Sequence, residues 1–317
     1  MRRKRLVTLL VLAVIIGAAI AIFRPQIGPD RQAMLDKAHA TPLSAPLAPM
    51  RVFHLGHSLV GRDMPAMVEQ LAGAGHSHAS QLGWGTSLRE HWYPDTPING
   101  FDQENDHDQF LPARAAISSG EFDAVVLTEM VELRDAINHH DSPTYKSFWA
   151  DLARQASPDT RVYLYETWHR LDDPDGWLDR LDRDFSELWR GQILAGDIAR
   201  SGTDRATRII PAGQVMAEFV RQVEAQGGVG NVPNREALFA RHDNGDLDMI
   251  HLSDIGKYLV ALTHYAVLYK RAPLGLPFEL QRADGSPADA PTPDVARLMQ
   301  EVTWQVVGRL PETGVGS

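Results

Sequence analysis

Short apolar segments that alternate with longer amphipathic segments are the feature that most constrains the fold of this chain. The clearest of them, FDAVVL at 122–127, is nearly continuous and follows a glycine, which is typical of a parallel strand buried on both faces of a sheet. The pattern predicts an α/β fold, a doubly wound parallel sheet with helices on both faces. The expected strands cover residues 51–55, 78–82, 122–127, 161–165 and 207–211.

The amphipathic segments complete this pattern and set the extent of the domain. The chain has 317 residues, and α/β folds of about 250 residues often form a single domain. We therefore expect one domain over 51–275, with a C-terminal loop and helix over 276–317 that pack on it. Apolar residues at helical spacing predict helices over 63–72, 145–155, 178–195, 214–225, 255–269 and 296–307.

The N-terminus has the composition of a membrane signal. The sequence opens with MRRKR, and Thr8 is the only polar side chain in the apolar segment 6–23. As a helix this segment would be roughly 27 Å long, close to the thickness of the hydrocarbon core of a bilayer. We therefore expect residues 1–24 to form a transmembrane signal anchor, followed by a proline-containing linker over 25–50. The small residues of Ala19-Ile20-Ala21 leave a cleaved signal peptide open as the alternative.

Charge is distributed unevenly along the chain. Residues 1–24 hold five of the 31 Lys and Arg residues and none of the 41 Asp and Glu residues, so the rest of the chain carries a net charge of −15. Because a basic flank stays in the cytoplasm, we expect a single-pass protein of a bacterial-type inner membrane with its domain in the periplasm. Cleavage would give a secreted protein instead. An acidic domain without a basic stripe indicates that nucleic acid is not a partner.

Cysteine and histidine usage restricts the kinds of site that are possible. The chain has no cysteine, which excludes a disulfide scaffold, a thiolate zinc site and a cysteine nucleophile. The pairs His76/His78 and His139/His140 lack a third ligand at a diagnostic spacing. We therefore expect neither a metal nor a cofactor.

Residues able to form a catalytic relay follow the expected strands, where folds of this type bind their ligands. Gly56 permits a sharp turn after the first strand, and Ser58 then lies where a helix begins and backbone N–H groups favour negative charge. A glycine loop that includes Gly85 follows the second strand. Asp248 precedes His251 by three residues and can orient its imidazole. The order predicts a Ser–His–Asp relay with Ser58 as nucleophile and His251 as general base and then general acid.

The order of these motifs resembles the SGNH (GDSL-like) hydrolase superfamily. The first family block, Gly-x-Ser-Leu, is similar to FHLGHSLV (53–60), and the fifth block, Asp-x-x-His, is similar to DMIHLSDIGKYL (248–259). The glycine of the second block resembles Gly85 in GWGTSLREHW, with Gly83 as the alternative. The run TRIIPAGQVM (207–216) is similar to the strand before the fifth block. This resemblance implies a flavodoxin-like three-layer α/β/α fold and esterase chemistry on acyl groups, often acetyl.

The resemblance implies a role for several residues. Ser58, His251 and Asp248 would be catalytic, and the N–H groups of Ser58 and Gly85 would bind the oxyanion. The family's third block, usually Gly-x-Asn-Asp, is replaced here by Thr128-Glu129, so the chain resembles a branch with an atypical third block. We expect Thr128 to assist the oxyanion site. The residues expected to contact substrate are Trp84, Glu129, Trp168 and His169.

The expected function is that of a membrane-anchored, exported serine esterase. Its substrate would be an acylated, most simply acetylated, carbohydrate or another small ester. Two alternatives remain open at this point. The same relay could transfer an acyl group to a polysaccharide as an O-acyltransferase, or the replaced third block could mark a non-catalytic module that binds glycans. The acyl group, the sugar and the oligomeric state are not determined by the sequence.

Overall fold

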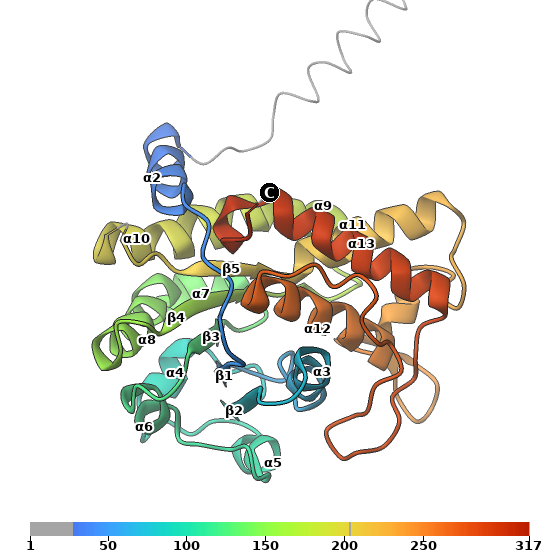
Figure 1. Cartoon of the computed structure of the whole chain (residues 1–317), viewed down its shortest axis with the longest axis horizontal. Coiled ribbons are helices and arrows are strands. Elements are labelled where there is room, and N and C mark those ends of the chain that lie inside the picture. The colour runs from blue at the N-terminus through green and yellow to red at the C-terminus, as the bar shows by residue number, and fades with distance from the viewer. Residues whose placement is uncertain (1–27, 203, 317) are drawn as a thin grey trace, which may run out of the picture.

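The computed structural model describes residues 28–202 and 204–316, which surround a five-stranded parallel sheet (Figure 1). The strand order is β2-β1-β3-β4-β5, and every neighbouring pair is parallel. The predicted α/β fold with a parallel sheet is therefore confirmed. The strands are β1 (Arg51–Leu55), β2 (Ser77–Gln81), β3 (Ala124–Thr128), β4 (Arg161–Glu166) and β5 (Arg208–Pro211).

The strand order fixes where a ligand can bind. Strand β2 lies on one side of β1, whereas β3, β4 and β5 follow in turn on the other side. The connections after β1 and β2 therefore leave the sheet in opposite directions and open a crevice at the carboxyl ends of the strands. This is the switch point at which doubly wound folds bind ligands.

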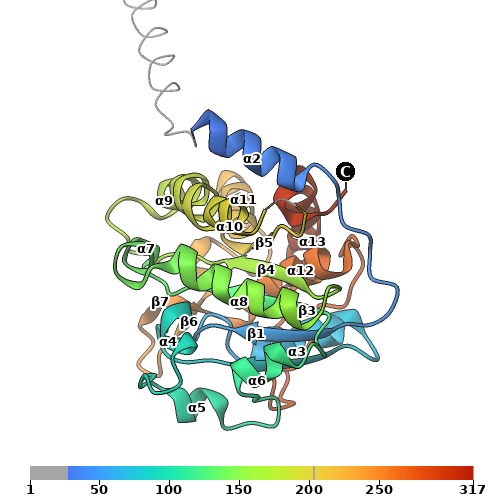
Figure 2. The ribbon, with the colours of Figure 1, turned by 90° about the vertical axis from the view of Figure 1, so that its left-hand side faces the viewer.

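Helices cover both faces of the sheet, because successive strand residues point to opposite faces. Val52 and Val126 pack on one face, and Phe53 and Val125 pack on the other. Figure 1 shows the helices on either side of the sheet, and Figure 2 looks onto the side that α8 covers. On the face of Val52 lie α3 (Asp63–Ala72), α11 (Ala212–Ala225), α12 (Asp254–Tyr269) and α13 (Pro293–Arg309). On the other lie α4 (Leu88–Trp92), α6 (Ala113–Ser118), α7 (Leu133–His140) and α8 (Ser142–Ala156).

The helix expected over 178–195 is not one regular helix. It begins as α9 (Trp177–Asp184), continues as the π-helix η1 (Phe185–Leu194) and ends as α10 (Ala195–Ser201). Apolar spacing predicted a helix here but not the change in hydrogen-bond pattern. The remaining short elements are α5 (Phe101–Asn105) and the 3₁₀ turns η2 (Arg235–Leu238) and η3 (Pro311–Thr313).

Part of the segment expected as a linker over 25–50 is helical. Residues Pro29–His39 form helix α2, which packs against α10 with Leu35 only 1% exposed. A proline in the first helical turn favours this start, and Leu35 and Ala38 place apolar groups on one face. The prolines at 42, 46 and 49 indicated an extended segment, which the structure has only after α2.

The chain between α11 and α12 contains an antiparallel hairpin that the sequence did not predict. It consists of β6 (Phe239–Arg241) and β7 (Leu247–Leu252). Its polar residues match neither a buried strand nor an amphipathic helix. At the C-terminus, α13 packs on α11 and α12, as expected for the closing helix. The expected anchor over 1–24 lies outside the described residues, and none of the helices within those residues is long and apolar enough to cross a bilayer.

Candidate active site

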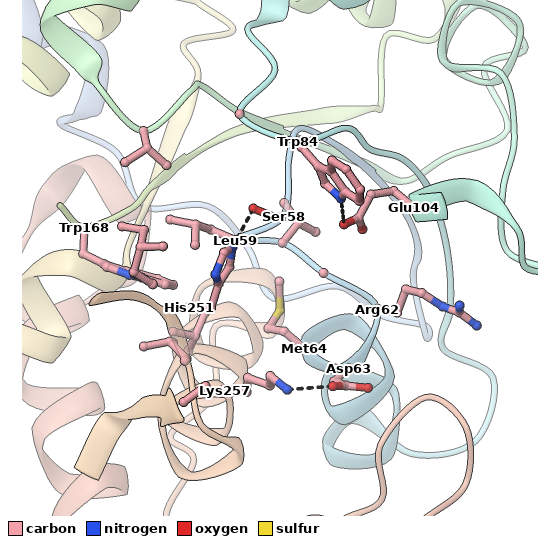
Figure 3. A pocket seen from close by; sticks show the side chains of 18 of the residues that line it. Ser58, Leu59, Arg62, Asp63, Met64, Trp84, Glu104, Trp168, His251 and Lys257 are labelled. Carbon is pink, nitrogen blue, oxygen red and sulfur yellow. Dashed lines mark hydrogen bonds and ion pairs between the residues drawn. The ribbon is translucent and has the colours of Figure 1, made fainter. Parts of the chain in front are cut away.

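A tight turn at the end of β1 presents Ser58 to a pocket. A Cβ atom at Gly56 would lie 2.5 Å from the Cβ of Thr128, so only glycine lets this turn pack against the end of β3. Ser58 follows the turn, is half-buried and lines the pocket shown in Figure 3. The structure therefore places Ser58 beyond the first strand, where the sequence predicted it.

Strand β7 brings two further side chains to Ser58. The Oγ atom of Ser58 lies 3.0 Å from Nε2 of His251, and Nδ1 of His251 lies 2.9 Å from Oδ2 of Asp248. Because a carboxylate only accepts hydrogen bonds, Nδ1 carries the proton and Nε2 is free to accept the hydroxyl proton of Ser58. The three residues thus form one continuous hydrogen-bonded relay, although Ser58 and His251 are 193 positions apart.

Asp248 is held in place by the backbone as well as by the imidazole. Its Oδ1 accepts the N–H groups of Ile250 and His251, both at 2.9 Å. Partial burial alone would raise the pKa of Asp248, but the two N–H groups and the imidazole outweigh burial and lower the pKa below its ordinary value. Asp248 is therefore ionised at neutral pH and can stabilise an imidazolium at His251.

Two backbone N–H groups border the pocket without an acceptor of their own. Within the described residues, neither the N–H of Ser58 nor that of Gly85 donates a hydrogen bond to another group. Gly85 has a φ of 58°, and a Cβ atom there would meet no neighbour, whereas a Cβ atom at Gly83 would lie 2.3 Å from Thr86 Oγ1. Gly83 therefore serves packing, and Gly85 is the glycine that faces the pocket.

The pocket has a volume of about 770 Å³ and extends from Ser58 towards α3 and α12. Its wall beside the relay is mainly apolar and includes Leu59, Met64 and Ile250. At the end far from Trp84, Figure 3 shows Lys257 paired with Asp63, whose Oδ2 lies 2.7 Å from the lysine Nζ. The charge of Lys257 is therefore paired within the protein.

Trp84 forms the opposite rim of the pocket. Its side chain is 51% exposed, and its Nε1–H donates to Oε1 of Glu104 at 2.8 Å. The indole ring lies directly over Gly100, where a Cβ atom would come within 2.1 Å of the ring. One face of the ring is thus supported by the backbone, and the orientation of the ring is fixed by Glu104 (Figure 3). Trp84 lies at the site, as predicted.

Two buried histidines support the turn that carries Ser58. His57 Nε2–H donates to the carbonyl oxygen of Glu129 at 2.7 Å, and His91 Nε2–H donates to that of Gly56 at 2.7 Å. Burial lowers the pKa of His57 and that of His91 to about 4. Both rings are therefore neutral at neutral pH, and they bind the carbonyl groups of Glu129, after β3, and Gly56, after β1.

Two predicted site residues at the end of β3 do not reach the pocket. Thr128 is fully buried beneath Gly56 and does not line the pocket, so its expected role in the oxyanion site is not supported. Glu129 is also fully buried and bonds the N–H groups of Leu88 and Met130. Its expected contact with substrate is corrected accordingly, because its side chain points into the protein.

The two predicted site residues after β4 have structural surroundings. Trp168 is 1% exposed and donates its Nε1–H to the carbonyl oxygen of Ile250, so it supports the wall of the pocket but offers no ring face for stacking. His169 is buried, lies 3.3 Å from Asp184 and borders a separate cavity with Arg180. Trp168 therefore lies in the wall of the pocket that contains Ser58, as part of its support, whereas the expected contact of His169 with substrate is corrected, because His169 borders another cavity.

Sequence reasoning missed residues that approach the pocket from distant parts of the chain. Glu104 and Met64 belong to short helical segments, and no motif marks either of them. The sequence showed only that Glu104 is charged and that Met64 has the apolar spacing of a helix. Within the residues that the structure describes, no group of three or more His, Asp or Glu side chains could hold a metal ion.

Comparison with known proteins gives matches by structure. No protein-family model matches the sequence, and no curated protein sequence is significantly similar to it. A DUF4886 family protein from Bacteroides uniformis is 14% identical and has a TM-score of 0.50, with 82% of this chain and 95% of that chain covered. At this identity the likeness shows a shared fold.

Further solved structures are similar over much of their length. A candidate GDSL-like lipase from Parabacteroides merdae is 13% identical, with a TM-score of 0.42 and 72% of this chain and 99% of that chain covered. A carbohydrate acetylesterase from Sinorhizobium meliloti is 11% identical, with a TM-score of 0.35 and 82% and 100% covered.

Proposed function

We propose that this protein is an SGNH-type serine ester hydrolase that removes acyl groups, most simply acetyl, from carbohydrate. The observation that carries the proposal is the hydrogen-bonded relay from Ser58 through His251 to Asp248 at the edge of a pocket. A serine hydroxyl bonded to a neutral imidazole, which a carboxylate orients, is the arrangement that activates serine as a nucleophile.

The acylation step follows from this geometry. Ser58 Oγ attacks the ester carbonyl carbon while its proton moves to Nε2 of His251, and Asp248 stabilises the resulting imidazolium. The carbonyl oxygen becomes an oxyanion, which the free N–H groups of Ser58 and Gly85 can bind. The tetrahedral intermediate then expels the alcohol, which takes the proton from His251 Nε2 and leaves an acyl-serine.

Deacylation repeats these steps with water. A water molecule gives one proton to His251 Nε2 and attacks the acyl-serine carbonyl carbon. Collapse of the second intermediate returns that proton to Ser58 Oγ and releases the acid. If a sugar hydroxyl enters in place of water, the same steps transfer the acyl group, so product analysis with a sugar acceptor present distinguishes hydrolase from O-acyltransferase.

Carbohydrate is the favoured substrate class because of the Trp84 rim. Aromatic rings bind the apolar face of a sugar, and carboxylate oxygens accept hydrogen bonds from its hydroxyl groups. Trp84 and Glu104 offer both groups within one pocket that also contains Ser58. The apolar wall beside Ser58 suits the acyl group.

Ser58→Ala tests the proposal directly. We expect the variant to lose hydrolysis of p-nitrophenyl acetate and of acetylated oligosaccharides, with a fall in kcat of about 10⁵–10⁶. The Ser58→Ala variant should also no longer be labelled covalently by a fluorophosphonate probe. The control is Ser118→Ala, which alters an exposed serine on α6. Equal rates for wild type and Ser58→Ala would refute the serine mechanism. Absence of labelling in wild type, with glycan binding retained, would instead favour a non-catalytic glycan-binding module.

We also propose that the protein is anchored in a bacterial-type inner membrane with its catalytic domain in the periplasm. The support is the basic and apolar sequence of residues 1–24. Proteinase added to spheroplasts should degrade the domain, and the intact protein should fractionate with membranes. Recovery of a shortened chain in the soluble periplasmic or secreted fraction would indicate cleavage, and protection from proteinase would refute export.

A further inference from the structure

Glu129 is a fully buried acidic residue whose side chain accepts hydrogen bonds from three separate groups. Its Oε1 accepts the N–H of Leu88 at 3.1 Å and that of Met130 at 2.9 Å. Its Oε2 accepts the hydroxyl of Ser142 at 2.6 Å. The carboxyl group thereby connects the end of β3 to the beginnings of α4 and α8.

The backbone of Glu129 makes a fourth contact, this one with the nucleophile turn. Its carbonyl oxygen accepts Nε2–H of His57, the residue that immediately precedes Ser58. Leu88, bound by the side chain, lies three positions after Gly85. One residue therefore contacts both segments that supply the N–H groups of the proposed oxyanion site.

The loop depends on such hydrogen bonds at Gly85, because no neighbouring atoms hold the chain in place there. A Cβ atom at Gly85 would meet nothing within 4 Å, and its φ of 58° is a conformation that other residues rarely adopt. The loop is fixed at one end by the N–H of Trp84, which donates to the carbonyl oxygen of Asn99 at 2.7 Å. At its other end, Glu129 binds the N–H of Leu88, and Trp149 Nε1–H donates to the carbonyl oxygen of Leu88.

We propose that Glu129 is a positioning residue that sets the distance between the N–H groups of Ser58 and Gly85. Oxyanion stabilisation requires donors about 2.7–3.1 Å from the oxygen that becomes charged. A residue bound to both donor segments controls that geometry without touching substrate. This inference rests on the proposed ester hydrolysis, because only that reaction places an oxyanion between the two groups.

The role requires hydrogen bonding but not a negative charge. Burial raises the pKa of Glu129, although the bonds from Ser142, Met130 and Leu88 partly oppose this. Glu129→Gln keeps one oxygen for the two N–H groups and offers its own N–H₂ to Ser142 Oγ. Glutamine should therefore replace glutamate, whereas alanine leaves three donors without an acceptor.

A matched control exists on the neighbouring strand. Glu166, at the end of β4, is also fully buried, and its Oε2 accepts the N–H of Gln214 near the start of α11 at 3.1 Å. Within the described residues its side chain contacts no segment that carries Ser58 or Gly85. Glu166→Ala therefore reproduces the loss of a buried carboxyl group without changing the proposed oxyanion site.

The experiment compares Glu129→Ala, Glu129→Gln and Glu166→Ala with wild type, using p-nitrophenyl acetate and denaturant unfolding. Both alanine variants should be destabilised, but only Glu129→Ala should lower kcat, by about 10²-fold, with KM nearly unchanged. Glu129→Gln should restore kcat to within about fivefold of wild type. If Glu129→Ala does not fold, Ser142→Ala removes one of the bonds and should lower kcat about threefold to tenfold. Wild-type kcat in Glu129→Ala, or equal losses in the two alanine variants, would overturn the inference.

Hydrogen exchange separates this inference from the proposed function. Amides in 83–92 and next to Met130, the two segments whose N–H groups the Glu129 side chain binds, should exchange faster in Glu129→Ala than in wild type and be unaffected in Glu166→Ala. If wild type hydrolyses no ester, the proposed function fails, and the exchange data still decide whether Glu129 holds these segments. Unchanged exchange in Glu129→Ala would refute the positioning role even if the enzyme is active.

Discussion

Trp84 precedes Gly85, so its ring borders the proposed oxyanion site while remaining half exposed. Gly100 supports one face of the ring, and the hydrogen bond to Glu104 fixes its plane. A ring held in this way loses little conformational freedom when a sugar stacks on it, and such preorganisation favours binding. The ring would bind the sugar and take no part in the bond-breaking step.

Trp84→Ala should therefore separate carbohydrate binding from chemistry. Loss of the stacking surface should raise KM for an acetylated oligosaccharide by about tenfold. For p-nitrophenyl acetate, which has no sugar ring, kcat/KM should stay within about twofold of wild type. Tyr93→Ala is the control, because Tyr93 is a similarly exposed aromatic residue that does not line the pocket. An equal loss on both substrates would show that Trp84 supports the catalytic loop and does not select carbohydrate.

Site residues within short sequence motifs could be predicted, whereas those at the end of a strand could not. Ser58 follows a glycine turn, and Asp248 and His251 are three positions apart, so short motifs placed them correctly relative to the relay. Thr128 ends strand β3 and Glu129 follows it, and successive side chains alternate direction there. The sequence alone did not determine which of these side chains would face the pocket, and neither does.

At the scale of elements, strands β3, β4 and β5 were predictable because their central residues are apolar on both faces of the sheet. Hairpin β6–β7 was not, because its strands are short and the polar residues Arg241, Asp248 and His251 interrupt their apolar residues. The hairpin contacts η2, which directly precedes β6, and α12, which begins two residues after β7. The sequence identified the Asp248–His251 pair but described its surroundings as a loop.

Helix α2 provides an element-scale prediction. Because Leu35 is buried against α10, Leu35→Ala should lower the free energy of unfolding by about 2–5 kcal/mol. A leucine in a solvated linker would contribute almost nothing. Leu47→Ala is the matched control, since Leu47 is fully exposed in the segment after α2 and its loss should change stability by less than about 0.5 kcal/mol. Urea unfolding followed by tryptophan fluorescence measures both. Equal effects of the two variants would show that α2 does not stabilise the domain.

At the scale of the whole molecule, the fold buries several ionisable side chains in their neutral forms. Burial lowers the pKa of five histidines to about 4 and holds the pKa of His54 well below its ordinary value. The five histidines are His57, His76, His91, His169 and His264. Burial acts in the opposite direction on acids and raises the pKa of Glu166 to about 8. In the folded domain these histidines are therefore neutral at neutral pH, and Glu166 keeps its proton up to about pH 8.

These shifts predict a loss of stability in acid. Below pH 6.5 the histidines of the unfolded chain bind protons, whereas those of the folded chain stay neutral until about pH 4. The unfolded state thus binds more protons, and each additional proton lowers the free energy of unfolding by about 1.4 kcal/mol per pH unit. Glu166 and Glu129 act oppositely, because their folded forms retain protons that the unfolded chain releases above about pH 4.5. Six histidines outweigh two acids, so stability should fall between pH 6.5 and pH 4.

Urea unfolding at intervals from pH 8 to pH 4.5 measures this slope. His264→Gln should make the slope shallower by about one proton, or 1.4 kcal/mol per pH unit, whatever its effect on stability at neutral pH. His139→Gln is the control for the loss of a histidine at the surface, because the His139 side chain is 70% exposed. A free energy of unfolding that stays constant or rises as the pH falls from 6.5 to 5 would contradict the prediction. It would mean that the buried histidines bind protons in the folded protein about as readily as in the unfolded chain, which requires water to reach rings that the structure buries.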